Sequence, residues 1–210
     1  MTDSVKKTVL FLGSSVTRGS AAGGRSFVEV LAEKYGFDYV KEAVDGTTLA
    51  DIGNGSYVTR LKKTDTDRRV DLFVCQLSTN DAYRGIPLCK TEQAVVYITE
   101  YVKKTYGCPV IFFTGTRFYS AEYERAVEMM VRLKDELGFE LIDLWNNPRM
   151  NAVDPERYKI YMNDPVHPTV RGYREWWVPE FEKVFDRYFT KKIKEETNDE
   201  TSDFNCQRRE

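Results

Sequence analysis

The chain has 210 residues, of which 41% are hydrophobic, so it is long enough to bury the core of one ordinary domain. Its 31 basic residues nearly balance its 33 acidic residues, which gives no electrostatic reason to expect a nucleic acid or an anionic membrane surface as a partner. We find neither a signal peptide nor a membrane-spanning run in the sequence. We therefore expect a cytoplasmic protein, unless a signal peptide has been removed.

Five short apolar runs are typical of buried strands, and they lie at about 8–13, 37–44, 70–77, 109–114 and 139–144. Helical periodicity predicts helices at about 26–35, 91–106, 121–137 and 170–188, with Pro179 expected to kink or split the last one. A further helix, broken by Gly53 and Gly55, is predicted to continue towards Leu61. We expect a small-residue loop at 14–24 and irregular structure at 145–168.

Strands that alternate with helices predict an α/β fold, with a five-stranded parallel sheet and helices on both faces. We expect residues 1–190 to form a single domain and the charged residues 191–210 to form a disordered tail. In parallel sheets, the loops after the strands open at one edge. This placement brings together Ser15, Gly46, Asn80 and the later His167.

The four cysteines show no C-x-x-C spacing, and His167 is the only histidine. These residues cannot supply an ordinary Cys/His zinc set, and Cys75, which lies in an apolar run, is predicted to be a buried free thiol.

Asp164 and His167 lie in one proline-bounded turn, Asp-Pro-Val-His-Pro. Histidine is the usual proton shuttle near neutral pH, and an aspartate at this offset can accept a hydrogen bond from one ring nitrogen. The opposite nitrogen is then available as a general base. A surface turn closed by the aspartate explains the same residues equally well when they are taken alone.

Each of three further residues at strand ends has one catalytic interpretation and one ordinary structural interpretation. Ser15 can be an exposed nucleophile or a helix cap. The Asn80 amide can donate to an oxyanion or form an Asx turn, and Gly46 can present an open N–H or simply allow a turn.

Together these segments resemble the SGNH (GDSL-type) hydrolases over about residues 7–188. The resemblance rests on Gly13-Ser14-Ser15, Val44-Asp45-Gly46-Thr47, Ser78-Thr79-Asn80-Asp81 and Asp164-x-x-His167. Two positions depart from the family pattern. Ser14 replaces an aspartate that shapes the nucleophile turn, and Ser78 replaces a glycine, which alters the loop that aims Asn80.

The resemblance implies a three-layer flavodoxin-like fold and ester hydrolysis through an acyl-enzyme, without metal or cofactor. Ser15 would be the nucleophile, His167 the general base and Asp164 its orienting partner. The oxyanion would be held by the N–H groups of Ser15 and Gly46 and by the side chain of Asn80.

The sequence defines the substrate less closely than it defines the reaction. Aromatic and basic residues near the site are candidates for substrate binding, namely Tyr83, Arg84, Arg117, Phe118 and Tyr119. Packing or solvent exposure explains each of them equally well. Small acyl esters of a carbohydrate are the leading hypothesis, and lysophospholipids, thioesters and aryl esters remain open.

Two other classes of function compete with the hydrolase. A nucleotide-binding protein is disfavoured because the loop after the first strand lacks G-x-G-x-x-G and the Gly-Lys-[Ser/Thr] of a P-loop. A non-catalytic relative that binds a carbohydrate or a partner protein keeps the fold but has an inert serine. A classical α/β-hydrolase is disfavoured because Thr17 stands where Gly-x-Ser-x-Gly needs a glycine.

Overall fold

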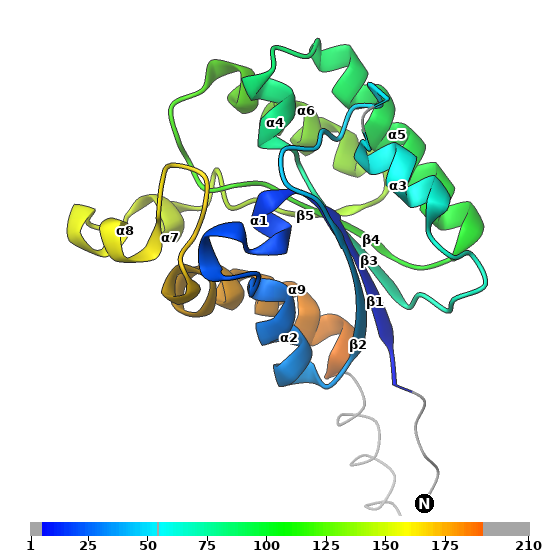
Figure 1. The fold of residues 1–210 in the computed structure, drawn as a ribbon, viewed down its shortest axis with the longest axis horizontal. Coiled ribbons are helices and arrows are strands. Elements are labelled where there is room, and N and C mark those ends of the chain that lie inside the picture. The colour runs from blue at the N-terminus through cyan, green and yellow to red at the C-terminus, as the bar shows by residue number, and fades with distance from the viewer. Residues whose placement is uncertain (1–5, 54, 191–210) are drawn as a thin grey trace, which may run out of the picture.

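The computed structural model describes residues 6–53 and 55–190. At its centre is a five-stranded sheet with the order β2-β1-β3-β4-β5, and every neighbouring pair of strands is parallel. The strands are β1 (Thr8–Gly13), β2 (Asp38–Ala43), β3 (Leu72–Gln76), β4 (Val110–Phe113) and β5 (Glu140–Ile142) (Figure 1). This is the strand order of flavodoxin-like folds. The predicted α/β class with a parallel sheet is therefore confirmed.

The three central strands, β1, β3 and β4, are buried on both faces of the sheet, which explains why they are nearly continuous apolar runs, whereas the edge strand β2 is partly exposed and carries charged residues. In β1, Val9 and Phe11 pack into the core on one face, and Leu10 and Leu12 pack into the core on the other. This alternation follows from the two-residue period of a strand.

Helices cover both faces of the sheet, as the ribbon shows (Figure 1). One face carries α2 (Phe27–Tyr35), the π-helical segment η2 (Gly172–Trp177) and α9 (Val178–Phe189). The opposite face carries α3 (Tyr57–Lys63), α5 (Leu88–Thr105) and α6 (Ala121–Leu137).

The predicted helix at 170–188 is divided near its proline. Pro179 lies in the first turn of α9 and cannot donate a backbone hydrogen bond to the preceding turn, and the π-helical segment η2 directly precedes α9. The expected split is thus a change of helix type within a nearly continuous helical stretch.

Several short helices lie where loops or irregular structure are predicted. These are α1 (Ser15–Arg18), α4 (Thr79–Tyr83), α7 (Pro148–Asn151) and α8 (Pro155–Tyr161), together with the short 3₁₀ turn η1 (Ser20–Ala22). The helix predicted to be broken by Gly53 and Gly55 and to continue towards Leu61 begins as α3 only at Tyr57, after both glycines. Helices of four to seven residues give too little periodicity to be detected in sequence.

Cys75 is fully buried, as predicted, and burial raises the pKa of its thiol. Over the described ranges, no helix is both long and apolar enough to cross a membrane. The predicted tail at 191–210 lies outside the described residues, so its disorder and the boundary of the domain remain predictions.

Candidate active site

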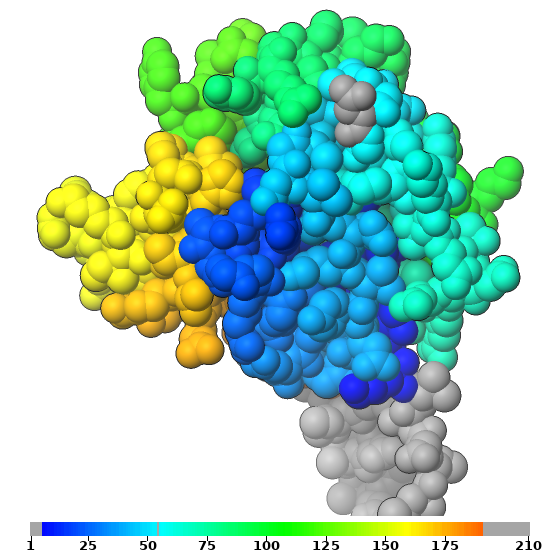
Figure 2. Space-filling view, in the orientation of Figure 1, coloured from blue at the N-terminus to red at the C-terminus, as the bar shows by residue number. Residues whose placement is uncertain are grey.

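The candidate site lies at the carboxyl edge of the sheet, where the strand order changes direction between β1 and β3. Ligands of open α/β sheets bind at such a switch point. Ser15 begins α1 directly after β1, and Asn80 lies in α4 directly after β3. In the space-filling view, the blue segment around α1 lies against the yellow-to-gold segment that carries α8 and the residues after it (Figure 2).

Ser15, His167 and Asp164 form a chain of hydrogen bonds. Ser15 Oγ lies 2.7 Å from His167 Nε2, although the two residues are 152 positions apart in sequence. On the other side of the imidazole, His167 Nδ1 lies 2.8 Å from Asp164 Oδ2. An imidazole held in this way can take a proton from the serine hydroxyl.

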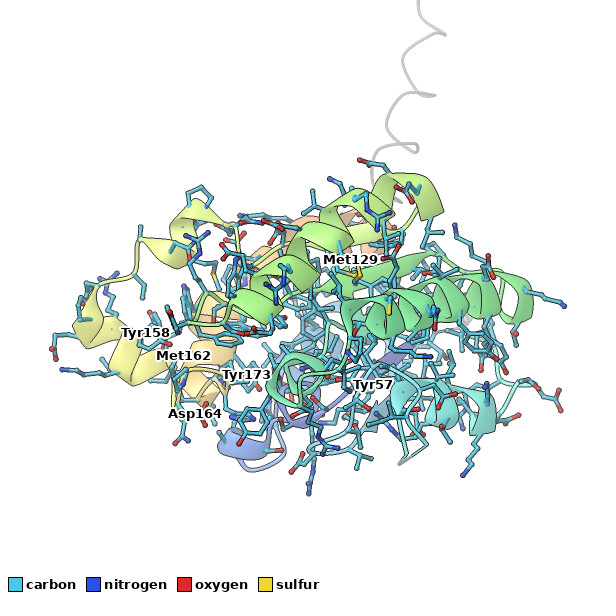
Figure 3. All side chains as sticks on the ribbon, turned by 90° about the horizontal axis from the view of Figure 1, so that it is seen from above. Tyr57, Met129, Tyr158, Met162, Asp164 and Tyr173 are labelled. Carbon is cyan, nitrogen blue, oxygen red and sulfur yellow. The ribbon has the colours of Figure 1, made fainter. Side chains whose placement is uncertain are left out.

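Asp164 lies on the loop that follows α8, near the outer edge of the molecule (Figure 3). Partial burial by itself would raise the pKa of its carboxyl group. Backbone N–H groups of Val166 and His167 donate to Oδ1 at 2.8 and 2.9 Å, and the imidazole also contacts the carboxylate. Together these hydrogen bonds lower the pKa below the ordinary aspartate value, so Asp164 is held as an anion.

The side chain of Gln76, the last residue of β3, holds the turn that carries Ser15. Its Oε1 accepts from Ser14 N at 3.1 Å, from Thr17 N at 3.2 Å and from Thr17 Oγ1 at 2.8 Å. Gly13 precedes this turn, and a Cβ there would lie 2.0 Å from Thr17 Oγ1. Glycine is therefore required by close packing of the turn onto the end of β1.

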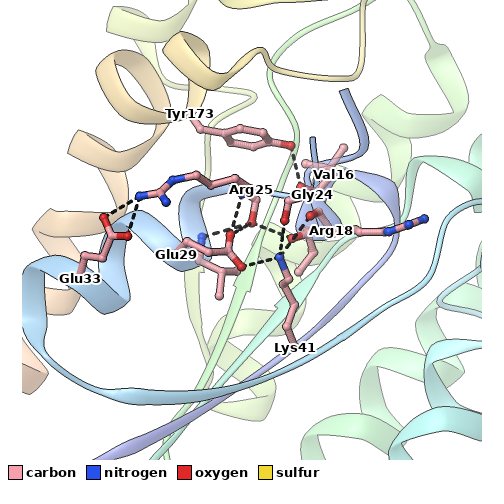
Figure 4. Close-up of polar contacts among 11 residues, drawn as sticks. Val16, Arg18, Gly24, Arg25, Glu29, Glu33, Lys41 and Tyr173 are labelled. Carbon is pink, nitrogen blue, oxygen red and sulfur yellow. Dashed lines mark hydrogen bonds and ion pairs between the residues drawn. The ribbon is translucent and has the colours of Figure 1, made fainter. Parts of the chain in front are cut away.

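The carbonyl groups of α1 are bound by side chains from elsewhere in the chain. Tyr173 Oη donates to Val16 O at 2.7 Å, and Ser26 Oγ donates to Thr17 O at 2.7 Å. Lys41 Nζ donates to Arg18 O at 3.2 Å and pairs with Glu29 (Figure 4). An isolated four-residue helix is unstable, so these tertiary contacts hold Ser15 in place.

Asn80 lies in α4, where the sequence predicts a loop. Its Nδ2 donates to Thr47 O at 2.9 Å, which uses one of two amide hydrogens and leaves the second for a ligand. Ser78, the residue that replaces the family's glycine, forms the N-cap of α4, and its hydroxyl accepts from Asp81 N. A serine is well suited to this position.

Gly46 and its neighbours form the second part of the site. Gly46 has a φ of 68°, a conformation that favours glycine, and its carbonyl accepts from Arg84 Nη2 at 2.7 Å. Within the described ranges, the N–H groups of Ser15 and Gly46 donate no hydrogen bond; Ser15 lines the cleft beside the site, whereas Gly46 does not.

Asp81 ties the Gly46 loop to the helices around Asn80. Its buried carboxylate accepts from Leu49 N at 2.8 Å, from Ala50 N at 2.9 Å and from Thr91 Oγ1 at 3.0 Å. Asp81 appears in sequence as the second residue of the Asn-Asp pair, but its role in holding this loop was not predicted.

A cleft of about 750 Å³ opens over the serine and the imidazole. Three of the predicted substrate-binding residues line it, namely Tyr83, Phe118 and Tyr119. The two predicted arginines do not line it: Arg84 binds the Gly46 carbonyl, and Arg117 lies over the Trp145 ring at 5.9 Å. Lining residues absent from the sequence prediction are Thr79, Ala82, Ser120, Ala121, Glu122, Pro165 and Val166.

A parallel α/β sheet with a serine, an imidazole and a carboxylate hydrogen-bonded in series at its carboxyl edge is the arrangement of serine hydrolases. The sequence model of the GDSL-like Lipase/Acylhydrolase family matches residues 11–175, so the chain belongs to this family of ester-bond hydrolases. A catalytic triad and an oxyanion hole are typical of the family. No curated protein matches the sequence significantly.

Solved structures share the fold at low sequence identity. A Lactobacillus plantarum protein is 18% identical with a TM-score of 0.73, covering 89% of this chain and 100% of its own. A G-D-S-L family lipolytic protein from Veillonella parvula is 20% identical with a TM-score of 0.70, covering 86% and 99%. An acetylxylan esterase from Geobacillus stearothermophilus is 16% identical with a TM-score of 0.65, covering 90% and 96%.

Proposed function

We propose that the protein hydrolyses carboxylic esters through a covalent acyl-enzyme formed on Ser15. Ser15 Oγ attacks the acyl carbon while His167 Nε2 takes the hydroxyl proton. The tetrahedral intermediate expels the alkoxide, which receives that proton from the imidazolium. A water molecule then attacks the acyl-enzyme with His167 again as general base, which releases the acid and restores Ser15.

Asp164 and three hydrogen-bond donors complete the proposed machinery. The Asp164 carboxylate holds the imidazole in one tautomer and stabilises its protonated form. The oxyanion is stabilised by the N–H groups of Ser15 and Gly46 and by Asn80 Nδ2. The observation that carries this proposal is the 2.7 Å separation of Ser15 Oγ and His167 Nε2, supported by the position of both residues in the wall of one cleft.

Replacement of the nucleophile tests the proposal directly. We expect Ser15→Ala to lower kcat for a chromogenic acetyl ester by at least about 10³-fold, because no other group can form the acyl-enzyme. A fluorophosphonate probe should label the parent protein, and peptide mapping should place the label on Ser15 and not on Ser14 or Ser20. Activity of Ser15→Ala within a few-fold of the parent would exclude this mechanism. An unlabelled, inactive parent would favour the non-catalytic relative.

We further propose small acyl esters, in particular acetyl esters of a carbohydrate, as the substrate. Tyr83 and Tyr119 line the cleft with side chains that are almost completely exposed. Exposed aromatic rings beside a catalytic serine suit the apolar faces of sugar rings. The acetylxylan esterase with the same fold is consistent with this substrate class.

A lipid-like acyl ester is the second candidate, because the cleft continues into a neighbouring hollow. This hollow of about 340 Å³ shares Ala82 and Glu122 with the cleft, and Ile86, Pro87 and Leu88 contribute to its wall. An acyl chain that extended from Ser15 into this hollow would favour lysophospholipase or thioesterase activity.

A series of aryl esters and acetylated sugars of rising size separates the two substrate classes. We expect kcat/KM to be highest for acetyl esters. We expect Tyr83→Ala/Tyr119→Ala to raise KM for an acetylated oligosaccharide by about 30-fold, since two stacked rings contribute on the order of 1 kcal/mol each. The same double variant should change KM for a small aryl acetate little. A maximum at long acyl chains would reject the carbohydrate hypothesis in favour of the lipid one.

A further inference from the structure

Arg60, in α3, contacts four separate parts of the chain beneath the candidate site. Its guanidinium donates to Gly13 O at 2.7 Å, to Thr47 Oγ1 at 3.2 Å and to Gly55 O at 3.0 Å. A further N–H donates to the carbonyl of Glu42. The side chain thus joins the carboxyl ends of β1 and β2 to the loop that contains Gly46.

Every one of these acceptors is neutral. In the described part of the chain, Arg60 forms no ion pair, whereas most other arginines pair with a carboxylate. The guanidinium lies over the ring of Tyr57 at 5.2 Å, and Tyr57, the first residue of α3, is fully buried in the core (Figure 3). Burial disfavours the charged guanidinium, and the charge of Glu42 and the bound carbonyl groups offset that cost without a direct ion pair.

The contacts of Arg60 connect the two halves of the proposed oxyanion hole. Gly13 precedes the turn that carries Ser15. Thr47 follows Gly46, and its carbonyl accepts from Asn80 Nδ2 at 2.9 Å. A continuous path therefore runs from the Asn80 amide through Thr47 and Arg60 to the end of β1 and the nucleophile turn.

We propose that Arg60 is a positioning residue that sets the oxyanion donors of the Gly46 loop relative to Ser15 and adds positive potential behind them. This inference rests on the proposed acyl-enzyme mechanism. Displacement of donors by about 1 Å costs up to about 10²-fold in rate, and preorganised positive charge favours the oxyanion over the neutral ester. Loss of Arg60 should therefore weaken transition-state binding more than substrate binding.

An arginine is required for the geometry and not only for the charge. The planar guanidinium presents several donors in fixed directions, so it can bind carbonyls from separate segments at once. A lysine ammonium at this position would keep the charge but could not reproduce this set of contacts.

The experiment compares Arg60→Met and Arg60→Lys with Arg69→Met. Arg69 is an exposed arginine that pairs with Asp71 before β3, far from the carboxyl edge of the sheet. For each protein, kcat is measured per active site titrated with the fluorophosphonate probe, together with KM for a small acetyl ester. The affinity of a boronic acid, which forms a tetrahedral anionic adduct with serine, is measured in parallel.

For Arg60→Met we expect kcat per titrated site to fall by roughly 10- to 100-fold, with a similar loss of boronic acid affinity and KM within about threefold of the parent. Arg60→Lys should recover part of both losses, and Arg69→Met should change neither. If Arg60→Met does not fold, Arg60→Lys carries the same comparison against the parent.

Retention of both kcat per titrated site and boronic acid affinity in the Arg60 variants, with only a lower thermal midpoint, would reject this role and leave the proposed function intact. A parent protein that is not labelled at Ser15 would reject the proposed function and this inference with it. The two failures are therefore distinguishable.

Discussion

A single carboxylate orients the only histidine of this chain. Asp164 accepts from two backbone N–H groups in its own turn and from the imidazole. The backbone hydrogen bonds fix the carboxylate, and the carboxylate fixes the ring with Nε2 towards Ser15. The proposed general base therefore owes its orientation to a turn of four residues.

The ionisation of this pair predicts the acid limb of the pH profile. Because hydrogen bonds lower its pKa, Asp164 stays ionised as the pH falls through the range in which an ordinary aspartate starts to take up a proton. The acid limb of kcat/KM should therefore correspond to uptake of one proton and not two, with a loss of about tenfold per pH unit. Diethylpyrocarbonate should abolish activity, since His167 is the only histidine.

The control for this experiment is protection of His167 by the boronic acid during modification. Activity that survives complete modification of His167 would remove this residue from the mechanism. A fall in kcat/KM that corresponds to uptake of two protons would instead indicate that Asp164 is not held as an anion.

At the scale of the elements, α1 depends on contacts with other parts of the molecule. It has four residues, and its carbonyls accept from side chains of β2, the N-cap of α2 and η2. A helix that short cannot hold itself together, so the placement of Ser15 is a property of the packed structure.

Loss of one such contact should affect both stability and rate. In Tyr173→Phe, the buried carbonyl of Val16 loses its donor, and we expect a decrease of about 1–3 kcal/mol in the free energy of unfolding. The added freedom of α1 should lower kcat several-fold. Urea denaturation and steady-state kinetics measure the two effects. Tyr158→Phe, on α8, is the matched control, and equal behaviour of the two variants would contradict the role of Tyr173.

At the scale of the whole molecule, an aromatic layer joins the sheet to α2 and α9. Phe27 lies at its centre, with ring centroids 4.4 Å from Phe181, 5.1 Å from Phe113 and 6.0 Å from Phe11. These rings come from β1, β4, α2 and α9, so the layer links segments from both ends of the described chain.

Removal of the central ring should therefore destabilise the entire fold. We expect Phe27→Ala to reduce the free energy of unfolding by about 3–5 kcal/mol, through lost burial and the cavity left behind. Val131→Ala, at a partly exposed position on α6, should change it by less than about 0.5 kcal/mol. Calorimetry or urea denaturation measures the difference, and a loss below about 1 kcal/mol would show that the layer tolerates the cavity.

The sequence by itself determined the class of fold, the family and the candidate nucleophile and base. These depend on local patterns: apolar runs of strand length, polar residues at the ends of those runs, and the spacing of Asp164 and His167 in one turn. The fold and the family are confirmed, whereas the catalytic roles of Ser15, Asp164 and His167 remain predictions that the geometry supports.

Only the tertiary structure decided which side chains hold the site together and which face the substrate. Asn80 lies on a helix too short to show periodicity, and Arg84 and Arg117 turn to a carbonyl and a ring instead of the cleft. Arg60 and Lys41 act mainly on backbone carbonyls from distant segments. Every residue carries a carbonyl group, so such partners leave no trace in the sequence and are selected only when the chain is packed.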